Sequence, residues 1–255
     1  MAPAMLIWAG AVLGAIIGSF LATLVVRWPQ GRSIARGRSS CDLCGVPIGA
    51  ARLIPILSFA LQRGRAACCG SRINGLHPLA EIAAAGIGAL SFAIAADPAE
   101  ALAGALFGWL LLALALCDAR HLWLPDRLTG ALALGGLAVG VAGIAPPLAD
   151  RLIGGAAAFA AFAMIRHGYR LLRHREGMGG GDVKLFAAIG LWLGWRMLPL
   201  VLLGAALAGL LWCIVELARR RPLGAGSSVP FGMFLALAAW AAWIANATGW
   251  TPSMI

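Results

Sequence analysis

Charged residues are scarce in this sequence of 255 amino acids. They make up 12% of the chain, against about 25% in an average soluble domain. Only ten of them are aspartate or glutamate, whereas hydrophobic residues make up 61% of the chain. A chain of this composition cannot cover a water-soluble fold with polar side chains, so the composition excludes an ordinary soluble domain and predicts an integral membrane protein.

Several well-known functional motifs are missing as well. The sequence contains no nucleophile elbow, no Walker phosphate-binding loop and no dinucleotide-binding glycine pattern. A basic region before the first apolar segment is also absent, and that segment, 23 residues long, exceeds the apolar part of a signal peptide. We therefore expect the first segment to stay in the protein as a membrane span.

Long apolar segments are what the sequence does contain. A transmembrane helix needs about 20 residues, and eight segments reach or approach this length, although the fifth and sixth, with 14 and 13 residues, are short. The sequence therefore predicts an all-α integral membrane protein with about eight transmembrane helices. The segments are 4–26, 79–96, 101–117, 128–145, 152–165, 183–195, 198–217 and 229–247.

The basic residues are placed unevenly between these segments. Of the 20 lysines and arginines, 17 lie in the loops after the first, third, fifth and seventh segments, and Lys184 lies at the start of the sixth segment on the same side. Only Arg151 and Arg196 lie in the opposite loops. By the positive-inside rule the basic loops are cytoplasmic and both termini lie outside. The net charge of +10 is thus explained by membrane topology, and the expected partners are lipid and not nucleic acid.

Three regions follow from this topology. Residues 1–26 form the first transmembrane helix, 27–78 a cytoplasmic cysteine-containing loop domain, and 79–255 a core of seven transmembrane helices. The loop domain holds four of the six cysteines, which are Cys41, Cys44, Cys68 and Cys69. Cytoplasmic thiols stay reduced, so this set favours metal binding over disulfides.

The spacing of the cysteines suggests zinc but is irregular. Cys41 and Cys44 have the two-residue spacing and the following glycine of a zinc knuckle. In the second half of the loop, Ala66 stands where a regular knuckle would have the cysteine that pairs with Cys69. Three interpretations remain open: Cys68 supplies the missing sulfur, three thiolates bind together with another ligand such as His77, or the loop binds no metal.

Two aspartates lie where apolar segments meet the cytoplasmic side. Asp182 follows Gly179, Gly180 and Gly181 and directly precedes the sixth segment, while Asp118 ends the third segment at nearly the same depth. Ionisable residues beside the hydrocarbon region are costly and are often functional. The glycines permit close approach of another chain. The alternative is that Asp182 only caps the following helix.

Two other acids have simpler explanations. Asp126, after Pro125, is expected to be the N-cap of the fourth segment. Glu81, near the start of the second segment, is either an acid in the first helical turn, favoured by the helix dipole, or a further functional residue.

Two neighbouring carboxyl groups can carry out peptide hydrolysis. Like charges at close range do not both ionise, so the pair shares a proton. One carboxylate can then take a proton from water while the other polarises the peptide carbonyl, as in aspartic proteases. Gly179, Gly181 and Lys184 are predicted to support the loop or the substrate beside Asp182.

Taken in order, these motifs resemble the type IV prepilin peptidases, a branch of the GxGD membrane aspartic proteases. The resemblance covers nearly the whole chain and rests on residues 18–21, the cysteine loop with 54–58 and 63–65, and residues 78–81, 118, 124–126 and 177–184. It implies an enzyme of the bacterial inner membrane that removes the leader peptide from type IV prepilins or type II secretion pseudopilins. The catalytic residues would be Asp118 and Asp182, at the cytoplasmic face.

The resemblance also implies a second activity. Many members of the family N-methylate the new amino terminus with S-adenosylmethionine, an activity tied to the N-terminal cytoplasmic loop. This chain departs from the family pattern at Ala22, where the family has asparagine, and at Ala66. The length of the loop is kept, so the sequence leaves the methyltransferase activity open.

Two rival functions use the same residues. A transporter would use Asp118 and Asp182 as a proton or cation relay, with the cysteine loop as a zinc-stabilised cap. A membrane methyltransferase would retain the two aspartates only for structure. We prefer the peptidase because it alone accounts for the glycine loop and both aspartates together.

Overall fold

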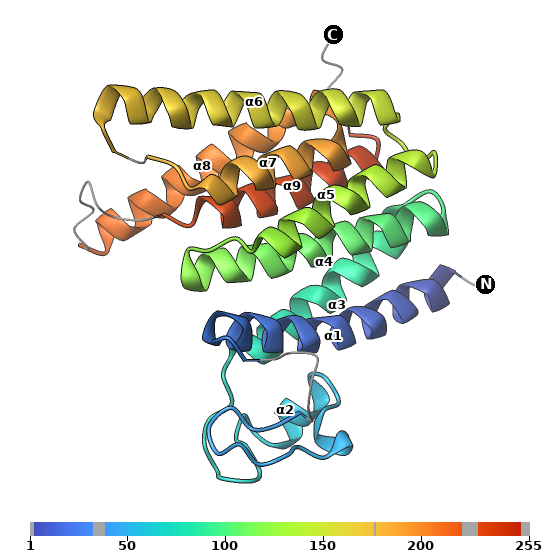
Figure 1. The fold of residues 1–255 in the computed structure, drawn as a ribbon. Helices are drawn as coiled ribbons and strands as arrows, with labels where there is room; N and C mark the ends of the chain where they lie inside the picture. The colour runs from blue at the N-terminus through green and yellow to red at the C-terminus, as the bar shows by residue number, and fades with distance from the viewer. Residues whose placement is uncertain (1–2, 33–38, 176, 221–228, 251–255) are drawn as a thin grey trace. The chain divides into compact units, whose positions relative to one another are not determined.

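A computed structural model describes residues 3–32, 39–175, 177–220 and 229–250 (Figure 1). The chain divides into two compact units, residues 1–94 and 95–255. Within the described residues the regular structure is helical, with only two isolated β-bridges. The prediction of an all-α protein is confirmed.

The first unit is a helical hairpin with a loop domain between its two helices. Helix α1 (Pro3–Arg27) packs antiparallel against α3 (Leu76–Ile94). Gly10, Gly14 and Gly18 recur every four residues on α1, and a Cβ atom at any of them would lie within 3.0 Å of the α3 backbone. Small residues at this spacing let membrane helices pack closely.

The loop domain contains little regular structure. It includes the short helices η1 (Trp28–Gln30), η2 (Ala50–Arg52) and α2 (Leu57–Leu61). The two β-bridges, Ser40 with Pro47 and Arg65 with Arg72, each close one cysteine-containing turn.

The second unit contains the other helices. They are α4 (Pro98–His121), α5 (Asp126–Val141), α6 (Leu148–Arg173), α7 (Gly180–Leu193), η3 (Trp195–Met197), α8 (Leu198–Ala218) and α9 (Phe231–Ala247). Helix α7 packs against α5, α6 and α9, and α4 packs against α5 and α9. Stacked rings lie between these helices: Phe162 of α6 and Phe186 of α7 have centroids 4.3 Å apart, and Phe107 of α4 and Trp192 of α7 have centroids 4.9 Å apart.

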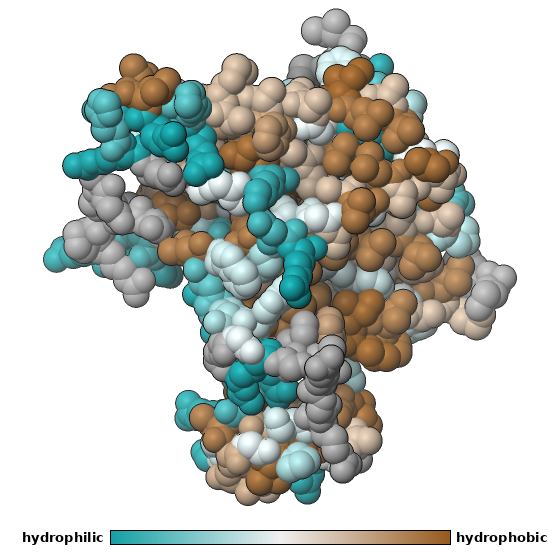
Figure 2. Space-filling view, in the orientation of Figure 1, coloured by the Kyte–Doolittle hydropathy of each residue, from teal (hydrophilic) through white to brown (hydrophobic). Residues whose placement is uncertain are grey.

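Each of the eight predicted apolar segments overlaps one helix, namely α1 and α3 to α9, although some segments extend a few residues beyond the helix end. Among the described residues, five helices are long and apolar enough to cross a membrane: α1, α3, α4, α6 and the η3–α8 segment. Helix α9 is apolar but shorter. Apolar side chains cover much of the surface of the helices in Figure 2, as lipid contact requires. The fifth segment, expected to be short, is the 26-residue helix α6.

Arg151 does not lie in an exposed outer loop. It is the fourth residue of α6 and is only 1% exposed. Its guanidinium donates hydrogen bonds to six backbone carbonyls, those of Gly136, Ile144, Ala145, Pro146, Leu191 and Trp192. The five N–H groups of arginine suit such a cluster. The prediction that Arg151 lies in an outer loop is therefore wrong, because its buried guanidinium joins the end of α7 to the α5–α6 turn.

Candidate active site and candidate metal site

Asp118 lies in the last turn of α4 and is 5% exposed. The helix ends at Leu122, whose left-handed conformation turns the chain and whose N–H bonds to the Asp118 carbonyl. The Asp118 side chain accepts a hydrogen bond from the backbone N–H of Met233, in the first turn of α9, at 2.9 Å. The carboxylate therefore points away from lipid and toward the start of another helix.

Asp182 is the third residue of α7 and is partly buried. The N-cap residue of α7 is Gly179. The Asp182 carboxyl reaches back to the backbone of Gly179, where a Cβ atom would lie 3.3 Å from Oδ2, as an acid at this position does in a capping box. The capping role given as the alternative for Asp182 is therefore compatible with the structure. The side chain is thus held at the helix start.

Leu124 connects the surroundings of the two aspartates. A Cβ atom at Gly181 would lie 2.9 Å from Leu124 Cβ, and one at Gly232 would lie 2.9 Å from Leu124 Cδ1 and 3.1 Å from Asp118 Oδ2. Leu124 therefore fits between the first turns of α7 and α9, and only glycine leaves room for it. Leu124 thus joins the first turn of α7, which holds Asp182, to the first turn of α9, which donates a hydrogen bond to Asp118, so residues 64 positions apart in sequence are gathered at one site.

Gly232 is the feature of this site that the sequence analysis missed. It follows Pro230 and Phe231 at the start of an apolar segment, which is also how an ordinary helix begins. The sequence offered one signal, a glycine in the first turn of a helix, where it lowers helix propensity without an evident reason.

Lys184 is held by an ion pair and not by the aspartate pair. Its Nζ atom lies 2.7 Å from Asp126 Oδ1, and both side chains are largely exposed. Exposed pairs of this kind contribute little stability. The expectation that Asp126 is an N-cap is wrong, because Pro125 occupies that position and Asp126 makes no capping bond. A lysine 58 residues away supplies its partner instead.

The four loop cysteines form one cluster, in which all four sulfur atoms lie within 4.8 Å of one another. The Cys44 and Cys68 sulfurs are 3.3 Å apart, and those of Cys41 and Cys69 are 3.9 Å apart. Tetrahedral zinc with Zn–S bonds of about 2.3 Å separates its sulfurs by about 3.8 Å, so the cluster can hold such an ion. Cys68 thus occupies the place that Ala66 leaves without a sulfur.

The electrostatics of the cluster also suit a metal. A hydrogen bond from the Ser71 hydroxyl lowers the pKa of Cys69 to about 6, and backbone amides lower the pKa of Cys41. Hydrogen bonding with Cys44 raises the pKa of Cys68 to about 12, so this thiol must release a proton to an incoming cation. His77 stays outside the set, 3.4 Å from Asp42.

Glu81 fixes the loop domain onto the hairpin of the first unit. It is 6% exposed, and its Oε2 atom accepts a hydrogen bond of 2.7 Å from the backbone N–H of Ile56. Ile56 has φ 63°, a conformation that a β-branched residue rarely adopts. Glu81 is the sixth residue of α3 and not part of its first turn. Its carboxylate therefore holds a strained turn in place.

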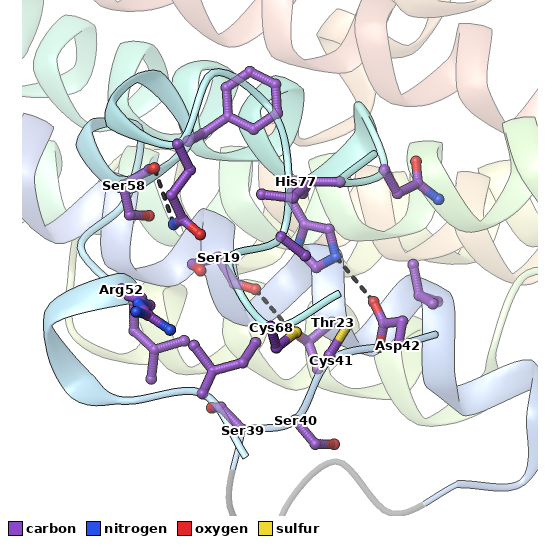
Figure 3. A pocket seen from close by; sticks show the side chains of 18 of the residues that line it. Ser19, Thr23, Ser39, Ser40, Cys41, Asp42, Arg52, Ser58, Cys68 and His77 are labelled. Atoms are coloured by element: carbon purple, nitrogen blue, oxygen red, sulfur yellow. Dashed lines mark hydrogen bonds and ion pairs between the residues drawn. The ribbon is translucent and has the colours of Figure 1, made fainter. Parts of the chain in front are cut away.

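A cavity of about 790 Å³ lies within the first unit, between α1, the loop domain and the start of α3. Polar side chains line it from three directions, among them Ser19 and Thr23 of α1, Asp42 and Arg52 of the loop, and His77 of α3 (Figure 3). Its volume suits a small-molecule ligand.

Comparison with known proteins gives a consistent result. Residues 12–95 match the sequence profile of the bacterial Peptidase A24 N-terminal domain, and residues 105–214 match that of the Type IV leader peptidase family. A prepilin leader peptidase/N-methyltransferase of Aeromonas salmonicida (strain A449) is 38% identical over 86% of this chain and 75% of its own length.

Two further proteins with the same description extend this similarity. The one from Dickeya chrysanthemi is 39% identical over 84% of this chain and 86% of its own length. The one from Pseudomonas putida is 34% identical over 95% of this chain and 91% of its own length. No solved structure matches the chain.

Proposed function

Since the chain belongs to the type IV leader peptidase family, we propose that it removes the leader peptide of prepilins or pseudopilins, with Asp118 and Asp182 as the catalytic pair. The observation that carries the assignment of these residues is their common site. Leu124 contacts the first turn of α7, which holds Asp182, and the first turn of α9, which donates a hydrogen bond to Asp118. The relatives give no support to a transporter using the same pair.

The mechanism follows from a pair that shares one proton. The ionised carboxylate takes a proton from a water molecule, whose oxygen attacks the scissile carbonyl carbon. The protonated carboxyl donates a hydrogen bond to the carbonyl oxygen as negative charge develops there. Collapse of the tetrahedral intermediate breaks the C–N bond, and a proton from the pair passes to the leaving amine. No covalent intermediate with the protein forms.

We propose that this site faces the cytoplasm. Within the second unit, α4 and α6 end, and α7 and α9 begin, on the side where the aspartates lie. Arg166, Arg170 and Arg173 lie at that end of α6, and Arg219 and Arg220 follow the end of α8. Basic residues collect on the cytoplasmic side of bacterial inner-membrane proteins.

We further propose that residues 27–78 form a methyltransferase region and residues 79–255 the peptidase core. S-adenosylmethionine would supply a methyl group to the new terminal amine. The cavity of the first unit is large enough for such a ligand. Ala22, which replaces the family's asparagine, is fully buried and is not among the described residues that line the cavity.

Zinc is the proposed structural ion of this region, held by the thiolates of Cys41, Cys44, Cys68 and Cys69. Four thiolates fill a tetrahedral coordination shell and leave no position for a substrate. The cysteines would therefore tie the two turns of the loop domain together, while methyl transfer takes place elsewhere.

The decisive test is co-expression with a prepilin, followed by mass spectrometry of the pilin amino terminus. Asp118→Asn and Asp182→Asn should each abolish leader removal. Glu100→Gln, at the other end of α4, is the matched control and should cleave as wild type does. Complete cleavage by either aspartate variant would refute the assignment. Methylation of a pre-cleaved pilin, measured in the same variants, separates the peptidase from a methyltransferase with a structural pair.

A further inference from the structure

The first turn of α9 contacts the Asp118 carboxylate directly. The N-cap residue of this helix is Pro230, and Phe231, Gly232 and Met233 form its first turn. We propose that this turn is part of the active site, with the Met233 backbone N–H holding Asp118 as the ionised base of the pair. The inference rests on the proposed peptidase function and adds a division of roles to it.

The hydrogen bond uses a donor that the helix itself cannot satisfy. The first four N–H groups of an α-helix have no intrahelical acceptor, and the Met233 N–H is one of them, donating to Asp118 Oδ2 at 2.9 Å. A helix start also carries a partial positive charge, which favours a nearby anion. Asp118 lies in the last turn of its own helix, where the partial charge is negative. The start of α9 offsets this unfavourable position.

Gly232 makes this contact sterically possible. It is buried, and a Cβ atom there would lie 3.1 Å from Asp118 Oδ2, 3.2 Å from Asp118 Cγ and 2.9 Å from Leu124 Cδ1. Leu124 is held between two helix starts and has little room to move. A side chain at position 232 would therefore push the carboxylate off the Met233 N–H.

Few charged side chains surround Asp118, and the backbone of Gly232 acts on its carboxylate together with the Met233 N–H. Helix α9 carries no ionisable side chain, and α5 contributes Asp126 and Arg127 in its exposed first turn. Helix α7 contributes Asp182 and Lys184, the latter paired with Asp126. The neighbours of Asp118 on α4 itself are Cys117 and Arg120, together with His121 at the helix end.

The two carboxyl groups therefore have different roles. Asp118, stabilised as an anion by the N–H group, is the base that takes the proton from water. Asp182, facing that negative charge, keeps the shared proton and donates a hydrogen bond to the peptide carbonyl.

The test is the pH dependence of kcat/KM for prepilin cleavage by the full-length protein in detergent. Met233→Pro removes the donor without breaking an intrahelical hydrogen bond, since proline is tolerated in the first helical turn. Met233→Ala removes the side chain but keeps the donor, and is the matched control. The Met233 N–H favours the ionised form of Asp118, because a hydrogen bond donated to a carboxylate stabilises the anion. Loss of this bond should therefore move the acid limb of the pH profile of kcat/KM to higher pH by about one to two units.

Met233→Ala should keep the wild-type limb. Gly232→Ala, which displaces the carboxylate without removing any N–H group, should move the limb in the same direction as Met233→Pro, and it decides the question where the proline variant does not fold. If Met233→Pro and Gly232→Ala lose activity equally at all pH values, with no shift in the acid limb of the pH profile, the inference is overturned. The aspartate variants keep the two proposals apart: if Asp118→Asn still cleaves, the proposed function itself fails.

Discussion

Gly181→Ala should damage catalysis far more than its size suggests. The added Cβ atom would lie 2.9 Å from Leu124 Cβ, 3.1 Å from Cδ1 and 3.4 Å from Cγ. The nearest of these atoms is fixed to the backbone, so no side-chain rotation relieves the contact. Overpacking of this kind costs about 1–3 kcal/mol. A displacement of about 1 Å at a catalytic group lowers the rate by about 10²-fold, and Asp182 is the next residue.

The assay compares three alanine variants at glycines with different surroundings. At Gly179 the Cβ atom meets only the Asp182 carboxylate, at 3.3 Å, and at Gly130, in α5, it meets nothing within 4 Å. We expect kcat for prepilin cleavage to fall by about 10²-fold in Gly181→Ala, to fall less in Gly179→Ala, and to stay at the wild-type value in Gly130→Ala. If Gly181→Ala keeps the wild-type kcat and melting temperature, the proposed tight packing of Leu124 against Gly181 is refuted.

The remaining predictions concern the first unit. Cys68→Ala should lose the metal, and the double change Ala66→Cys with Cys68→Ala should restore about one zinc per chain by completing the regular knuckle. Mass spectrometry of the metal content measures both variants. Full zinc occupancy in Cys68→Ala would contradict the four-sulfur site. Glu81→Ala should leave the Ile56 N–H without its acceptor at a cost of about 1–3 kcal/mol, so a protease should cut the loop between α1 and α3 faster. Glu81→Gln keeps an acceptor oxygen and should resist digestion. Equal digestion of the two variants would argue against the role of the Glu81–Ile56 hydrogen bond.

Local patterns in the sequence were enough to identify the helices and to nominate the two aspartates. Apart from the fifth, the apolar runs end within a few residues of a helix end, and an acid at such a boundary stands out because it is costly there. The glycines around Asp182 were equally visible. The reason why glycine is required at these positions was not visible, because Leu124 lies about 60 residues earlier in the chain. Hydropathy does not reveal which side chain packs against which glycine.

Contacts over long sequence distances explain the errors too. Arg151 was predicted to lie in an outer loop because the positive-inside rule treats each arginine as exposed to solvent. The rule does not take into account backbone carbonyls that can surround a buried guanidinium. Asp126 is of a residue type that N-caps favour, yet its partner is Lys184 from another helix. The contact of Met233 with Asp118 spans 115 residues, and no local pattern records it.

The glycines of α1 have a consequence for the loop domain. Because Gly10, Gly14 and Gly18 bring α1 and α3 into backbone contact, the two ends of the intervening segment, near residues 27 and 76, are already joined before any ion arrives. Bringing the two ends of a loop together has an entropic cost. Here the packing of α1 against α3 in the membrane already meets that cost. Metal binding then needs to order only two short turns, so a modest thiolate cluster can fold a domain that would be too small to fold by itself.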